Sequence, residues 1–132
     1  MIYRTNPQTT SAELNELFSL AWDAHEPRDF TPILKRSLVY VCAYMDVLLV
    51  GFVNVAWDGG VHAFLLDTTV HPDLRRQGIG RQLVRHAAEE ADRRGMEWLH
   101  VDYEPHLERF YEACGFRPTQ AGLLKLGNAR GD

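Results

Sequence analysis

The chain has 132 residues, of which 45% are hydrophobic, 24% charged and 11% aromatic, with a formal net charge of −4. This length and composition are typical of one soluble globular domain and exclude a mainly disordered chain, and the acidic balance disfavours a nucleic-acid-binding surface. No stretch approaches the ~20 apolar residues of a membrane span, and no signal-peptide pattern begins the sequence, so we expect no membrane association. The two cysteines, Cys42 and Cys114, cannot form a disulfide framework, which favours a cytoplasmic location.

Hydrophobic periodicity predicts one series of strands and helices. In chain order we expect a strand over Ile2–Arg4 and a helix with its N-cap at Ser11 and its apolar face ending at Trp22. We then expect a loop over Asp23–Pro32 and a short helix over Thr31–Arg36. Three strands are expected next, over Leu38–Tyr44, Val47–Trp57 and Val61–Val70. There follow a helix over Gly80–Arg94, a strand over Trp98–Asp102, a helix containing Leu107–Cys114 and a last strand within Gly122–Leu126. This order predicts a single α+β, or mixed α/β, domain that spans residues 1–132 and is built on one sheet.

Arginine is concentrated in one part of the chain. Of the 14 lysines and arginines, six lie in one short stretch: Arg75, Arg76, Arg81, Arg85, Arg93 and Arg94. Such a cluster in an acidic protein indicates either a local site for an anion or a solvated helix face, and the count alone does not separate the two.

The strand that ends at Val70 leads through a short loop to Gly78 and Gly80, where the next helix begins. The first turn of a helix has N–H groups without partners and a positive dipole end, and glycines let an anion approach the backbone closely. We therefore expect a phosphate or pyrophosphate site here. A P-loop is excluded because Arg81 and Gln82 follow Gly80, and the dinucleotide-binding motif is disfavoured because Leu83 stands where its third glycine belongs.

Two motifs together resemble the GNAT superfamily of acetyl-CoA-dependent N-acetyltransferases. The first is Val70-His-Pro-Asp-Leu-Arg-Arg-Gln-Gly-Ile-Gly80, which is similar to the pyrophosphate motif of that family. The second is Glu104-Pro-His-Leu-Glu-Arg-Phe-Tyr-Glu-Ala-Cys-Gly-Phe116, which is similar to a later family helix. The resemblance implies a mostly antiparallel central sheet with a splayed parallel strand pair, flanked by about four helices.

The resemblance also implies that acetyl-CoA is the co-substrate. Its pantetheine arm is expected along the backbone of Thr68, Thr69 and Val70, and its pyrophosphate in the loop made by Arg75, Arg76, Gln77, Gly78, Ile79, Gly80 and Arg81. No metal is expected, because the six histidines show no ligand spacing.

Tyr111 matches the family tyrosine proposed to protonate the departing thiolate, although its place on an apolar helix face also fits a core aromatic. Asp67 is the nearest carboxylate before the phosphate loop and is expected to be the base, an amine-binding group or a structural acceptor. Glu104 is a further candidate, at a position where many members have Asn. A chain of waters without a single base stays open as an alternative.

The acceptor site is expected near Asp102, at the end of the splayed strand, with Trp22 and Phe64 lining a pocket unless they belong to the core. The function expected is direct transfer of acetyl, in a ternary complex, to a primary amine of a small molecule or a peptide N-terminus. A homodimer is a common assembly in the superfamily. The alternatives are a non-catalytic acyl-CoA-binding or regulatory module of the same fold and, less favoured, a dinucleotide-binding domain.

Overall fold

A computed structural model describes residues 1–127 of the chain. The chain divides into two compact units, Met1–Val101 and Asp102–Asp132, and each unit has its own set of elements. No helix in residues 1–127 is long and apolar enough to span a bilayer.

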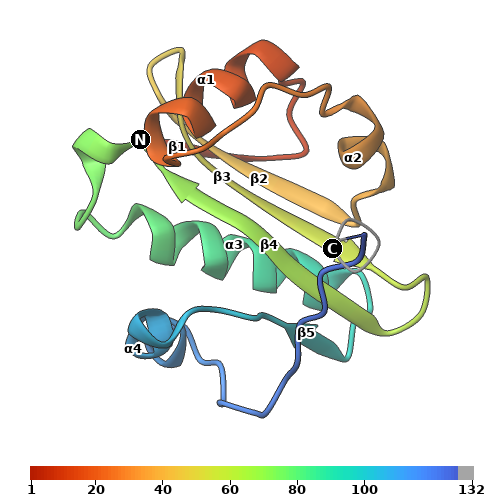
Figure 1. The fold of residues 1–132 in the computed structure, drawn as a ribbon. Helices are drawn as coiled ribbons and strands as arrows, with labels where there is room; N and C mark the ends of the chain where they lie inside the picture. Colours follow the sequence, from red (N-terminus) through yellow and green to blue (C-terminus); the bar gives the residue numbers. More distant parts are fainter. Residues whose placement is uncertain (128–132) are drawn as a thin grey trace. The chain divides into compact units, whose positions relative to one another are not determined.

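Five strands and three α-helices make up the first unit (Figure 1). In chain order they are β1 (Ile2–Thr5), α1 (Ser11–Ala21), α2 (Thr31–Arg36), β2 (Val39–Met45), β3 (Leu48–Trp57), β4 (His62–Val70), the 3-10 turn η1 (Pro72–Leu74), α3 (Ile79–Arg93) and β5 (Trp98–His100). The second unit contains the 3-10 turn η2 (Pro105–Leu107) and helix α4 (Glu108–Ala113).

The strands form one sheet in the order β1-β2-β3-β4-β5. All neighbours are antiparallel except β4 and β5, which are parallel and pair from His62 opposite Trp98 to Phe64 opposite His100. With α4, this arrangement confirms the predicted α+β class, a mostly antiparallel sheet with one parallel pair and four α-helices.

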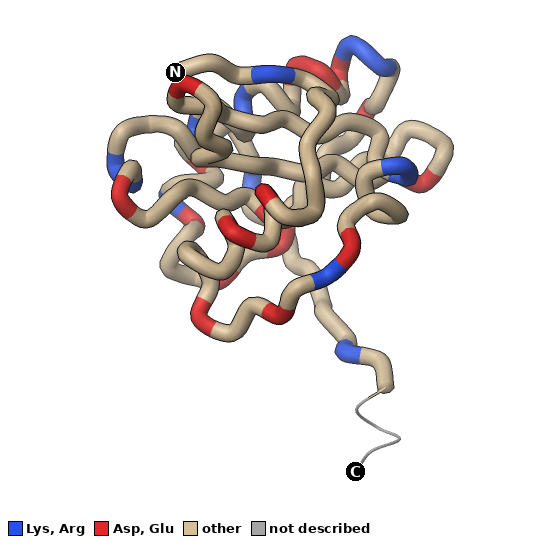
Figure 2. Tube along the Cα trace, turned by 90° about the horizontal axis from the view of Figure 1, so that it is seen from above, with Lys and Arg blue, Asp and Glu red and all other residues tan. Residues whose placement is uncertain are grey.

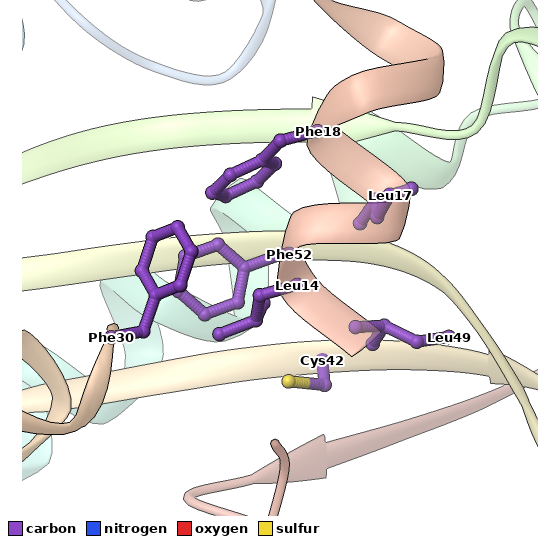
Figure 3. Close-up of a cluster of buried hydrophobic side chains, with 7 residues drawn as sticks. All are labelled: Leu14, Leu17, Phe18, Phe30, Cys42, Leu49 and Phe52. Atoms are coloured by element: carbon purple, nitrogen blue, oxygen red, sulfur yellow. The ribbon is translucent and has the colours of Figure 1, made fainter. Parts of the chain in front are cut away.

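One face of the sheet is covered by α1 and α2, and α3 lies on the other face (Figure 1). The apolar side chains of α1 recur at helical spacing and meet Cys42 of β2 and Leu49 and Phe52 of β3. The buried cluster on this face consists of Leu14, Leu17, Phe18, Phe30, Cys42, Leu49 and Phe52 (Figure 3). Burial raises the pKa of the Cys42 thiol to about 12, so this cysteine stays protonated and unreactive at neutral pH.

The approach of α3 to the sheet depends on Gly51 in β3. A Cβ atom at this position would lie 2.9 Å from Leu83 Cδ1 and 3.2 Å from Ala43 Cβ. Since both neighbours are themselves fully buried, neither has room to move away. Gly51 therefore sets how closely α3 can pack, and with it the position of the loop that enters α3.

Two expectations about local structure are wrong. The N-cap of α1 is Thr10 rather than Ser11, because Thr10 and Glu13 form a reciprocal capping box. The expected strand within Gly122–Leu126 does not form, and Leu123, Leu124 and Leu126 are more than 80% exposed. The described part of the second unit holds no other strand to bond with its backbone, and a lone strand cannot satisfy its own N–H and C=O groups.

Candidate active site

A β-bulge shapes the second half of β4. Leu66 pairs with Asn54 and Thr69 pairs with Phe52, so Asp67 and Thr68 together stand opposite the single residue Val53. The backbone of Asp67 is left-handed, with φ 59°, and the Thr69 hydroxyl donates a hydrogen bond of 2.9 Å to the Asp67 carbonyl oxygen. The bulge therefore interrupts the regular ladder at the predicted carboxylate.

The edge of β4 that faces β5 becomes free in the same stretch. The parallel ladder stops at Phe64 and His100, but β4 continues as far as Val70 and stays bonded to β3 on its other side. Within residues 1–101 the backbone groups on this edge from Leu66 to Val70 have no strand partner. They form a short template onto which an extended, amide-containing chain can add like a strand.

The Asp67 side chain is exposed at the surface, but many protein atoms lie around it. Desolvation by this surrounding protein raises the pKa of its carboxyl, and the positive charge of Arg28 acts in the opposite direction. A carboxyl with a raised pKa accepts a proton more readily at neutral pH than an ordinary surface aspartate. Asp67 thus has the properties of either a proton acceptor or an ammonium-binding group.

The loop between α1 and α2 carries Arg28 and is held in place by Asn15 of α1. The Asn15 side-chain N–H donates a hydrogen bond of 2.8 Å to the Arg28 carbonyl oxygen. The Asn15 side-chain oxygen accepts a hydrogen bond of 3.0 Å from the Arg28 backbone N–H and lies 2.8 Å from His25 Nε2. Trp22 stacks on Phe18 with ring centroids 4.4 Å apart and remains 37% exposed. The predicted acceptor loop is therefore ordered, with one indole edge available at the surface.

The loop before α3 has the geometry of an anion site. Arg76 and Gly78 are both left-handed, with φ 64° and 80°, and Gly78 is the N-cap of α3 without any side-chain cap. Apart from Gly78 and its immediate chain neighbours, no atom of residues 1–127 lies within 4 Å of the position that a Cβ of Gly78 would occupy. The N–H groups of the first turn of α3 are thus uncapped and approachable, which fits a pyrophosphate.

The arginine cluster has two parts with different partners. Arg85 pairs with Glu89, and Arg93 and Arg94 both pair with Glu90, so these three belong to a solvated helix face. Along the trace, acidic and basic residues are interspersed (Figure 2). Arg76 and Arg81 have no side-chain hydrogen bond or ion pair to any residue of the described chain. These two flank Gly78 and remain free to bind an anion.

The second unit carries Tyr111, Glu104 and Asp102. Tyr111 is on α4, is 7% exposed, and has ring contacts with Tyr103 at 5.0 Å and Phe110 at 4.9 Å between centroids. Glu104 Oε2 lies 3.5 Å from His106 Nδ1 with both side chains exposed, and Asp102 is exposed as well. The first unit contributes Trp22, Phe64 and Asp67, so the predicted site residues fall into two groups that belong to different units.

The model of the acetyltransferase (GNAT) family matches residues 8–116, which is most of the chain. The chain belongs to the GNAT acetyltransferase family. It is accordingly an acetyltransferase, and the resemblance that the two sequence motifs indicate is confirmed.

Relatives and solved structures agree with this assignment. The chain is 28% identical over 124 residues to a protein of Pyropia yezoensis named "Uncharacterized N-acetyltransferase ycf52", a match that covers 90% of this chain and 71% of the relative. It superposes on a putative acetyltransferase of Deinococcus radiodurans with TM-score 0.78 and 26% identity, covering 95% and 87% of the two chains. The aminoglycoside N-acetyltransferase AAC(6′)-Iy in complex with CoA has the same fold, with TM-score 0.75, 18% identity and coverage of 94% and 92%.

Sequence reasoning missed one polar cluster of this GNAT chain. His62 Nδ1 lies 2.8 Å from His100 Nε2, across the parallel strands β4 and β5. The two histidines are 38 residues apart in the chain and meet only through the register of β4 and β5, so no local spacing marks them. No group of three or more His, Cys, Asp or Glu that could hold a metal occurs in residues 1–127.

Proposed function

We propose that this GNAT protein transfers the acetyl group of acetyl-CoA to a primary amine by direct attack in a ternary complex. The observation that carries the proposal is the combination, on one strand-loop-helix segment, of the free β4 edge with the uncapped N-terminus of α3. The family match runs from residue 8 to residue 116 and so includes parts of both compact units. That extent supports treating residues 1–132 as one acetyltransferase domain.

Acetyl-CoA would supply the activated acetyl thioester. The backbone of Thr68, Thr69 and Val70 would pair with the amides of the pantetheine arm, and the N–H groups of Ile79, Gly80 and Arg81 would hold the pyrophosphate. The Arg75 side chain donates a hydrogen bond to the Ala21 carbonyl oxygen. Arg76 and Arg81 would neutralise phosphate charge around Gln77 and Gly78. The fit rests on the open space above Gly78 and on the missing side-chain cap.

The amine must lose a proton because an ammonium ion has no lone pair for attack on the thioester carbon. Asp67 would bind the incoming ammonium and accept its proton, directly or through water, since the raised pKa of its carboxyl brings it closer to neutral pH. When the carbon–sulfur bond breaks, the thiolate needs a proton, and the phenol of Tyr111 would donate it. Asp102 and Glu104 would supply negative charge for a cationic acceptor.

The acceptor class is a small-molecule amine or a peptide N-terminus. AAC(6′)-Iy is by name an aminoglycoside N-acetyltransferase, which supports amines in general as acceptors of this fold. Exposed Trp22 and Phe64 on the first unit would contact the apolar part of the acceptor.

A panel of primary amines tests this proposal, with release of the CoA thiol and the mass of the acetylated product as paired readouts. We expect at least one amine to give both signals in stoichiometric amounts. Tight acetyl-CoA binding without turnover on any amine would instead support the non-catalytic acyl-CoA-binding module. Absence of CoA binding together with NAD binding would support a dinucleotide-binding domain.

A further inference from the structure

The imidazoles of His62 and His100 form a direct pair across the parallel strands β4 and β5. Nδ1 of His62 and Nε2 of His100 are 2.8 Å apart, so one ring nitrogen donates a hydrogen bond and the other accepts it. The His100 ring also stacks on Phe64, with centroids 4.8 Å apart and planes inclined by 18°. The pair is therefore held by a hydrogen bond, by a ring stack and by two adjacent strands.

Strand register places this pair on the face that α1 covers. Directly opposite residues share a face, and Phe64 is opposite both Ala56 of β3 and His100 of β5. Along β3 the same face continues from Ala56 to Phe52, which belongs to the buried cluster under α1. The two imidazoles thus lie on the face that also carries the Arg28 loop.

The pair is a short distance along β4 from the bulge. His100 is level with Phe64, three residues before Asp67, which corresponds to about 10 Å at about 3.3 Å per residue. The side chains between them on this face, Phe64 and Leu66, are each 38% exposed, so water reaches the interval. Bridging waters would span this gap, because hydrogen bonds through water are nearly as favourable as direct ones.

We propose that the His100–His62 pair is a proton relay that carries the proton of the acceptor amine from the Asp67 region to bulk solvent. This inference rests on the proposed acetyltransferase function. It adds two groups that neither the sequence motifs nor the comparisons assign. Histidine suits the role because its ordinary pKa, about 6.5, lets it accept and release protons near neutral pH.

The transfer balances without any further reactant. Before transfer, His100 donates Nε2–H to His62 Nδ1, its own Nδ1 is bare, and His62 carries a proton on Nε2. A proton that arrives through water bonds to His100 Nδ1, the Nε2 proton passes to His62 Nδ1, and the His62 Nε2 proton leaves to solvent. One proton enters and one leaves, and both rings end neutral in the other tautomer. Rotation of the rings, or exchange of their protons with solvent water, restores the starting state.

Four acidic residues lie close to the pair along β4 or β5 or in the adjoining chain. Asp58 precedes β4 and interacts electrostatically with His62, and Glu97 precedes β5, where its N–H bonds the Val61 carbonyl at 2.9 Å. Asp67 lies further along β4, and Asp102 follows His100 in the chain.

The test compares His100→Gln and His62→Gln with the matched control His86→Gln, whose ring stacks on Tyr3 away from β5. With an amine that the wild-type protein acetylates, we expect kcat to fall about 10²-fold in each relay variant, the lower limit for general acid–base groups. The KM for acetyl-CoA and the melting temperature should stay at wild-type values, and added imidazole should restore turnover in His100→Gln. The acidic limb of kcat against pH, where a proton acceptor becomes protonated and stops working, should be shifted in both relay variants but not in the control.

Full turnover with an unchanged pH profile in both relay variants would overturn the relay and leave the proposed function intact. Failure to acetylate any amine would contradict both the proton relay and the proposed acetyltransferase function. Nitrogen-15 spectra of the wild-type imidazoles provide a readout that needs no acceptor. The relay requires His62 and His100 to titrate as a coupled pair, with one shared proton between Nδ1 and Nε2. Two independent titrations, each like that of His86, would contradict it.

Discussion

Arg75, in the loop before α3, donates a hydrogen bond from Nη2 to the carbonyl oxygen of Ala21 over 3.3 Å. Ala21 is the last residue of α1, where helix carbonyls lack intrahelical partners and the dipole is negative. The arginine therefore ties the phosphate loop to the beginning of the acceptor loop. We therefore propose a positioning role for Arg75, with Arg76 and Arg81 as the arginines that would meet the phosphates of CoA.

Substitution of Arg81 tests this division of roles. Arg81→Gln should weaken acetyl-CoA binding several-fold and flatten its dependence on salt, because one phosphate contact is lost. Arg85→Gln, on the same helix but paired with Glu89, should leave binding unchanged. Calorimetric titration at two salt concentrations measures both effects. Equal losses in the two variants would mean that only the overall charge of α3 matters.

Gly78→Val should abolish measurable acetyl-CoA binding. Valine is strained at φ 80°, and its side chain would fill the space over the first N–H groups of α3. Gly59→Val is the matched control, since Gly59 has φ 85° and equally open surroundings in the turn before β4. Both variants should lose about 1–2 kcal/mol of stability, the cost of left-handed backbone. Only Gly78→Val should lose the ligand, and retained affinity there would refute the pyrophosphate site.

Asp67→Asn should reduce turnover while the fold becomes at least as stable as before. The raised pKa means that the folded chain binds this proton more readily than the unfolded chain does. Stability from this group is therefore present at low pH and is lost as pH rises from the ordinary value of 3.8 through the raised one. Asparagine removes that loss and tolerates left-handed backbone as well as aspartate does.

Asp46→Asn is the matched control for Asp67→Asn, because Asp46 also has positive φ, 55°, in the turn between β2 and β3. It should leave turnover unchanged. Chemical denaturation at acidic and neutral pH, combined with steady-state kinetics, separates the two variants. A destabilised but fully active Asp67→Asn would make Asp67 a structural acceptor only.

Tyr111→Phe should lower kcat by about 10²-fold, the lower range for a general acid, with acetyl-CoA affinity retained. Tyr40→Phe provides the contrast, because the Tyr40 hydroxyl donates 2.8 Å to the Pro7 carbonyl. The Tyr40→Phe variant should lose about 1 kcal/mol of stability and keep the wild-type kcat. If Tyr111→Phe behaves like Tyr40→Phe, then Tyr111 is a core aromatic, as its contacts with Tyr103 and Phe110 alone would allow.

Elements whose signals are local in the sequence could be predicted well. The apolar stripe of α1, the hairpin of β2 and β3, and the glycine before α3 all appear where periodicity and turn residues place them. The N-cap was misplaced by one residue because Ser11 and Thr10 are equally good caps, and only the reciprocal bond from Glu13 distinguishes them. The strand expected within Gly122–Leu126 failed because strand formation depends on a partner that the segment itself does not contain.

The site could be predicted only where a motif marks it. The loop before α3 and the β4 residues before it could be singled out because their spacing is continuous in the chain, and their role in CoA binding stays a prediction. The bulge at Asp67 and the His62–His100 pair depend on register between strands, and the Arg75 bond depends on packing of α1 against the loop. No regular spacing of residues along the chain marks any of these contacts, so a single sequence does not predict them.

Amide hydrogen exchange with and without acetyl-CoA tests the central claim most directly, which is that CoA lies along the β4 edge and on the N-terminus of α3. We predict slower exchange of backbone N–H groups in two short segments, Thr68–Val70 and Ile79–Arg81, with the solvated ion-paired face around Arg85 unchanged. Exchange that is unaltered in these segments at saturating acetyl-CoA, or altered only elsewhere, would contradict the proposed binding site.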